Sequence, residues 1–104
     1  MSLSITTATV DDKLVVSVAG ELDVSNAPEL REALEAAEAD DAAIEVGIAE
    51  VPYMDSTGIG VFVGAAHRAA DAGRSFAVKN PQRNVRRILG MLGLLDELGI
   101  AAEE

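Results

Sequence analysis

The chain has 104 residues, a formal net charge of −10 at pH 7 and no cysteine. Its length allows one domain with one aliphatic core, and the lack of cysteine excludes disulfides and thiol catalysis. The strong negative charge makes nucleic acid and anionic membrane surfaces poor partners, because both would repel the protein.

The first two segments predict an antiparallel hairpin. Residues 3–10 are rich in β-branched side chains, and residues 13–19 alternate between apolar and other positions. Both patterns are typical of strands. Asp11 and Asp12 lie between the two segments and indicate a short turn.

The next segment predicts an amphipathic surface helix that ends near Asp40. Ser25 or Asn26 can cap its start, with Pro28 in the first turn. The apolar stripe consists of Leu30, Leu34 and Ala37.

Residues 42–48 predict a central strand, and residues 58–72 predict a helix that is apolar nearly all round. A stop follows at Gly73. One face of this helix can cover the sheet, which leaves Val61 and Ala65 on or near the outer face. Two interpretations stay open: an exposed patch that binds a partner, or a surface that other elements cover.

Residues 74–79 predict a further strand, followed by Asn80 as a helix cap and Pro81 at the first helical position. A third helix follows, and residues 94–102 could hold one last short strand or a turn. The third helix has an apolar stripe of Val85, Ile88, Leu89 and Leu92 and an exposed basic cluster of Arg83, Arg86 and Arg87. The order of elements predicts an α/β fold with a partly parallel, mixed sheet.

The stretch from Val51 to Gly60 joins a strand to a helix, and Ser56 lies at this junction. A serine there can cap the helix, and it can also accept a phosphate, because helix N-termini favour negative charge. From the residues alone, a cap is the simpler interpretation. Asp23 and Asp55 both lie at the ends of predicted elements, so the two carboxylates could be neighbours.

The sequence contains few residues in an arrangement that would support catalysis. His67 is the single histidine, and about three helical turns, or about 16 Å, separate it from Ser56 on one predicted helix. That distance is too long for a hydrogen bond. The sequence also lacks the spacing of a metal site, a phosphate-binding loop or a nucleophile elbow. We therefore expect no enzyme activity, no cofactor and no metal.

Several motifs together resemble the STAS family of sulfate transporter and anti-sigma factor antagonist domains. The resemblance spans about residues 3–100, and within the family it is strongest for stand-alone anti-sigma factor antagonists. It rests on Gly20-Glu21-Leu22-Asp23, Ala27-Pro28-Glu29-Leu30, Asp55-Ser56-Thr57-Gly58-Ile59-Gly60, Asn80-Pro81, Val85, Leu89 and Gly93-Leu94.

The resemblance implies a single STAS-like domain over residues 1–104, with a small mixed sheet of four to five strands and helices mainly on one side. It implies partner switching: the unphosphorylated protein binds an anti-sigma factor that is also a serine kinase, and phosphorylation of Ser56 releases it. Thr57 is the alternative acceptor, and a phosphatase resets the switch. The expected partner-binding residues are Asp23, Asp55, Ser56, Thr57, Gly58, Ile59, Gly60, Val61 and Ala65.

An alternative is a structural STAS subunit of a lipid-transport or stress-signalling complex, and a small hydrolase that uses Ser56 is a third hypothesis. The family's usual C-terminal helix has almost no counterpart after Ile100. Residues 1–3 are a candidate vector-derived or disordered leader. No apolar run approaches the roughly 18 residues of a membrane span, so we expect a cytoplasmic protein.

Overall fold

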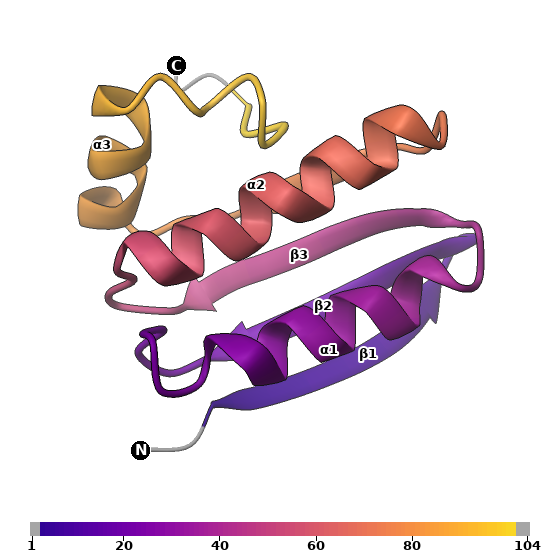
Figure 1. The fold of residues 1–104 in the computed structure, drawn as a ribbon, viewed down its shortest axis with the longest axis horizontal. Coiled ribbons are helices and arrows are strands. Elements are labelled where there is room, and N and C mark those ends of the chain that lie inside the picture. Colours follow the sequence, from indigo (N-terminus) through magenta and orange to yellow (C-terminus); the bar gives the residue numbers. More distant parts are fainter. Residues whose placement is uncertain (1–2, 102–104) are drawn as a thin grey trace.

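The structure, a computed structural model, describes residues 3–101, which form four strands and three helices in the order ββαβαβα. Figure 1 shows their arrangement. The strands are β1 (Ser4–Val10), β2 (Lys13–Ala19), β3 (Ala43–Glu50) and β4 (Phe76–Lys79), and the helices are α1 (Ala27–Glu38), α2 (Ser56–Asp71) and α3 (Arg83–Met91).

The strands form one mixed sheet in the order β1-β2-β3-β4. The pair β1–β2 is antiparallel, whereas β2–β3 and β3–β4 are parallel. Asp11 and Asp12 form the turn of the β1–β2 hairpin with φ of 52° and 67°, a left-handed conformation that suits a tight hairpin turn. The predicted hairpin and mixed α/β sheet are confirmed.

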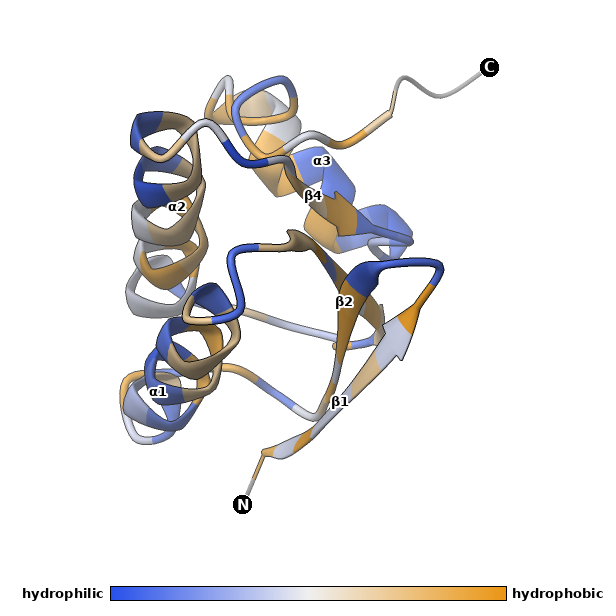
Figure 2. Cartoon of the chain, turned by 90° about the vertical axis from the view of Figure 1, so that its right-hand side faces the viewer, coloured by the Kyte–Doolittle hydropathy of each residue, from blue (hydrophilic) through white to orange (hydrophobic). Residues whose placement is uncertain are grey.

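The core lies between the sheet and helices α1 and α2, which pack on one of its faces (Figures 1 and 2). Alternate residues of the two central strands point into the core, and all three residues of the predicted apolar stripe of α1 are buried there. Phe62 of α2 is 0% exposed and fills the centre. The buried strand and α1 residues are Leu14, Val16, Val18, Ile44, Val46, Ile48, Leu30, Leu34 and Ala37.

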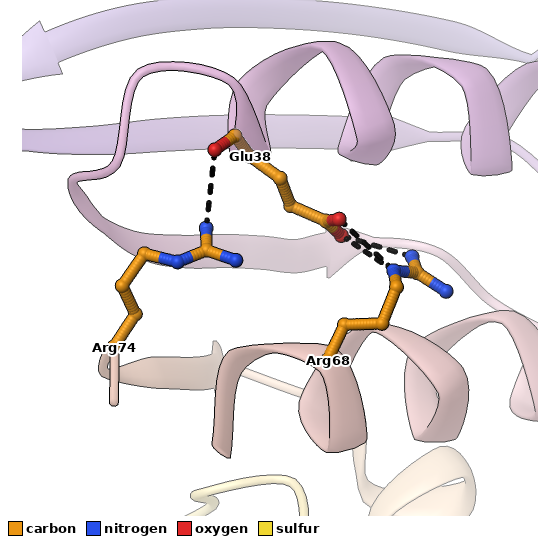
Figure 3. Close-up of polar contacts among 3 residues, drawn as sticks. All are labelled: Glu38, Arg68 and Arg74. Atoms are coloured by element: carbon orange, nitrogen blue, oxygen red, sulfur yellow. Dashed lines mark hydrogen bonds and ion pairs between the residues drawn. The ribbon is translucent and has the colours of Figure 1, made fainter. Parts of the chain in front are cut away.

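An ion pair fastens α1 to α2 (Figure 3). Arg68 donates to Glu38 through Nε, at 2.9 Å from Oε1, and through Nη2, at 2.9 Å from Oε2. Arg74 follows α2 and donates from Nη1 to the backbone carbonyl of Glu38 at 3.5 Å. The two arginines therefore hold the last turn of α1 against the end of α2.

Of the predicted helix caps, Asn26 is confirmed in its position only, and Asn80 is wrong. Asn26 occupies the N-cap position of α1, but its buried side chain accepts from the Asp23 amide at 2.9 Å and donates to the Glu21 carbonyl at 2.9 Å. Asn80 has φ of 60°, so it turns the chain after β4, and α3 begins only at Arg83.

The chain after α3 forms turns, and the sheet of the described residues has four strands. This segment nonetheless covers the edge of β4, because the Val78 amide donates to the Leu98 carbonyl at 2.8 Å. Of the candidate leader, residues 1 and 2 lie outside the described residues, and Leu3 is buried in the core.

Candidate functional site

Two loops lie side by side at the carboxyl ends of the parallel strands β2 and β3. Leu22 and Met54 form an isolated parallel bridge between them. The Leu22 amide donates to the Tyr53 carbonyl at 3.0 Å, and the Asp55 amide donates to the Leu22 carbonyl at 3.0 Å. The start of α2 and the loop before α1 therefore form one surface at this end of the molecule (Figure 1).

Asp55 holds this surface together. It is the N-cap of α2, and its Oδ1 accepts a hydrogen bond from the Gly58 amide at 3.1 Å. Its Oδ2 accepts another from the Val24 amide, in the neighbouring loop, at 3.2 Å. One carboxylate thus caps a helix and clamps two loops, and the negative charge also suits the helix N-terminus.

Ser56 is the first residue of α2, and its side chain is exposed. The interpretation of Ser56 as the cap is wrong, because Asp55 takes that role. Thr57 is exposed as well, and within residues 3–101 neither hydroxyl makes a hydrogen bond. Both hydroxyls are therefore accessible to a modifying enzyme.

Asp23 lies on the loop that Asp55 clamps, which confirms that the two carboxylates come from neighbouring loops. Its Oδ1 accepts hydrogen bonds from the Ser25 hydroxyl at 2.5 Å and from the Ser25 amide at 3.0 Å. These two bonds hold the pKa of the Asp23 carboxyl below its ordinary value, and the bond from the Ser25 hydroxyl contributes most. Asp23 is therefore ionised at neutral pH, which adds negative charge to the loop that Asp55 joins to the start of α2.

The rest of the expected partner-binding set divides by exposure. Gly60 is exposed, whereas Gly58 is buried against Leu22. Ile59, Val61 and Ala65 are only 8%, 5% and 2% exposed, because they belong to the core. Of the two interpretations left open for Val61 and Ala65, the exposed patch is therefore wrong, and the surface covered by other elements is confirmed.

Exposed apolar side chains lie elsewhere at this end, at positions that the sequence pattern does not predict. Val24 is 68% exposed and Tyr53 is 47% exposed, one on each of the two joined loops. The sequence signal for this apolar surface is a single valine and a single tyrosine, each in a predicted loop. We use the term Ser56 surface for the exposed residues Val24, Tyr53, Ser56, Thr57 and Gly60.

The start of α3 is fastened beside this surface. Gln82 donates from Nε2 to the Ala49 carbonyl at 3.0 Å, and Asn84 donates from Nδ2 to the Pro52 carbonyl at 2.8 Å. Both acceptors lie in or just after the end of β3. The loop that carries Tyr53 and Asp55 is thus braced from both sides, by α3 and by the loop before α1.

Groups suited to catalysis are not gathered here. His67 lies on α2 and pairs with Glu97, away from Ser56. Within residues 3–101, no group of three or more His, Cys, Asp or Glu side chains could hold a metal ion. The same residues include no helix that is both long and apolar enough to cross a membrane.

Comparison with known proteins gives a consistent result. The STAS domain family profile matches residues 4–104. The chain is 34% identical over 103 residues to an anti-sigma-B factor antagonist of Bacillus subtilis, covering 99% of this chain and 94% of that protein. An anti-sigma factor antagonist structure from Mycobacterium paratuberculosis has 26% identity and a TM-score of 0.83, covering 90% of this chain and 80% of that one.

The phosphorylated form of the Bacillus cell fate determinant SpoIIAA shares the fold. It has a TM-score of 0.72 and 21% identity, and the match covers 96% of this chain and 93% of that one.

Proposed function

Because the chain belongs to the STAS domain family, we propose that it is an anti-sigma factor antagonist switched at Ser56. In its unphosphorylated form it binds an anti-sigma factor with serine kinase activity and so frees a sigma factor for transcription. Phosphorylation of Ser56 releases it, and a phosphatase restores binding. It acts in the cytoplasm, where transcription takes place. The observation that carries this proposal is the exposed, unbonded Ser56 hydroxyl at the start of α2.

The helix start supports phosphorylation without unfolding. The first amides of α2 have no carbonyl partner within the helix. Of these amides, only that of Gly58 donates a hydrogen bond to the Asp55 side chain. A phosphoryl group on Ser56 adds about −1.5 to −2 charges at pH 7. Its oxygens can accept bonds from the remaining amides, and the helix dipole favours its charge. The modified protein therefore keeps its fold.

The same charge disfavours a bound partner. Val24 and Tyr53 offer exposed apolar area on the two joined loops, and exposed tyrosines often dominate binding energy. A phosphate on Ser56 must lose its water when a partner covers this surface, and the ionised Asp23 lies on the loop that Asp55 joins to the start of α2. Desolvation and repulsion then weaken binding through the Ser56 surface alone.

The test measures phosphorylation and binding together. Incubation with an anti-sigma factor kinase and ATP is expected to add one phosphate, which mass spectrometry maps to Ser56. Ser56→Ala should abolish the modification and Thr57→Ala should not. Ser56→Asp should weaken binding to the anti-sigma factor by about 10- to 100-fold, whereas Ser56→Ala should bind within a few-fold of wild type.

Other outcomes reassign the function. Modification that persists in Ser56→Ala and disappears in Thr57→Ala makes Thr57 the acceptor. Equal binding by wild type and Ser56→Asp, with no phosphorylation of either, contradicts the switch and favours a structural STAS subunit. Ester or phosphoester turnover that Ser56→Ala abolishes would indicate a hydrolase.

A further inference from the structure

The edge strand β1 is unusually open. Six of its seven residues are exposed, including Val10 at 47%. It pairs with β2 on its inner side, and within residues 3–101 no strand pairs with its outer side. An outer edge of this kind presents a row of backbone N–H and C=O groups that can bond to another strand.

The opposite edge of the sheet is protected. The strand β4 has only four residues, and its Val78 amide already donates to the Leu98 carbonyl. Gly99 packs so closely on this strand that a Cβ there would lie 2.7 Å from the Phe76 carbonyl oxygen. A further strand is therefore blocked at β4 but not at β1.

The usual protections are missing from β1. Edge strands commonly carry charges, proline or a bulge that prevents pairing with another chain. Residues 4–10 read Ser-Ile-Thr-Thr-Ala-Thr-Val, without a charge or a proline, and the register with β2 is continuous from Ser4 to Val10. In a protein of net charge −10, residues 4–10 carry no charge, so two copies of this strand can approach without direct repulsion between them.

We propose that β1 pairs with β1 of a second copy of this chain, antiparallel and symmetric about Thr7. Full overlap of residues 4–10 places Thr7 opposite Thr7, Ile5 opposite Thr9 and Thr6 opposite Ala8. These are neutral pairs, and threonine and β-branched cross-strand pairs are favourable. A symmetric interface of this kind closes as a dimer, and the two sheets become one continuous sheet.

The dimer is weak and depends on salt. A strand edge buries less surface than a standard protein interface, and the remaining acidic surfaces of the two copies repel. Added salt screens this repulsion and strengthens the dimer. The proposal does not rest on switching at Ser56, because β1 contributes no residue to the Ser56 surface.

Sedimentation measures the mass of the unmodified chain from about 10 µM to about 1 mM. With rising concentration, the mass should increase from 10.8 kDa toward twice that value. This increase should begin at a lower protein concentration in 1 M NaCl than in 0.1 M NaCl. Thr7→Lys places two like charges opposite each other and should raise the dissociation constant about two- to fivefold. Ser17→Lys adds the same charge to an exposed position on β2, away from the edge, and should not.

Cross-linking tests the register, because the chain has no cysteine of its own. Opposed Cα atoms of antiparallel strands are about 4.5 or 5.5 Å apart, and a disulfide spans either distance. Thr7→Cys should therefore form a covalent dimer under mild oxidation. Thr9→Cys is equally exposed, but in this register the two copies of residue 9 are about four residues apart, roughly 14 Å, and should not cross-link.

A monomer at every concentration and salt level overturns the proposal. A dimer that Thr7→Lys leaves intact overturns it too, because the contact then lies elsewhere. Cross-linking of Thr9→Cys as fast as Thr7→Cys refutes the symmetric pairing. Circular dichroism of each variant shows whether lost dimerisation comes from lost folding.

Discussion

Two glycines in the first turns of α2 should respond to alanine in opposite directions. A Cβ at Gly58 would lie 2.6 Å from Cγ and 2.7 Å from Cδ2 of Leu22. Leu22 is 0% exposed and is bonded through its backbone to the loop before α2, so it has little room to move. Such overpacking costs about 1–3 kcal/mol, and the higher helix propensity of alanine returns up to about 1 kcal/mol.

The expected net effect of Gly58→Ala is a loss of about 1–2 kcal/mol, which lowers Tm by about 4–15 °C for a domain of this size. Gly60 is the matched control, because a Cβ there meets no heavy atom of residues 3–101 within 4 Å. Gly60→Ala should therefore gain up to about 1 kcal/mol from helix propensity alone.

Thermal and urea unfolding followed by circular dichroism separate the two cases. The measurement compares the free energy of unfolding of both variants with that of wild type. The steric reasoning about Leu22 fails if Gly58→Ala is as stable as Gly60→Ala. A fall in stability at Gly60 would instead contradict the open space found there.

Three further changes test the contacts that hold the site and the helices. Asp55→Ala removes the cap of α2 and the bond to the Val24 amide, so urea unfolding should show a loss of about 1–2 kcal/mol. Glu38→Gln weakens the charged pair with Arg68, whose side chain is 40% exposed; the expected loss is about 0.5–1 kcal/mol and should shrink in 1 M salt. The lowered pKa of Asp23 stabilises the fold above pH 3.8, and this contribution is lost as the pH falls through the lower folded-state pKa. The Tm of Asp23→Asn should therefore be lower than that of wild type at pH 7. The two Tm values should converge as the pH falls below the folded-state pKa of Asp23.

The sequence by itself determined the elements. Alternation of apolar residues gave β2 its bounds of Lys13–Ala19, and the spacing of Leu30, Leu34 and Ala37 gave α1 its buried face. These signals are local, because the period of a strand or helix decides which residues share a face. The neighbourhood of Asp23 and Asp55 also followed, since parallel strands end at the same edge of the sheet. The motif around Ser56 marked the candidate site.

Only the tertiary structure decided which side chain does what. Asp55 rather than Ser56 caps α2, because its second oxygen also reaches an amide 31 positions away, at Val24. Val61 and Ala65 are buried rather than exposed, because α2 packs against more than the sheet. The open edge of β1 likewise depends on which strand lies outermost. Contacts between distant segments settle such questions, and a local pattern carries no information about them.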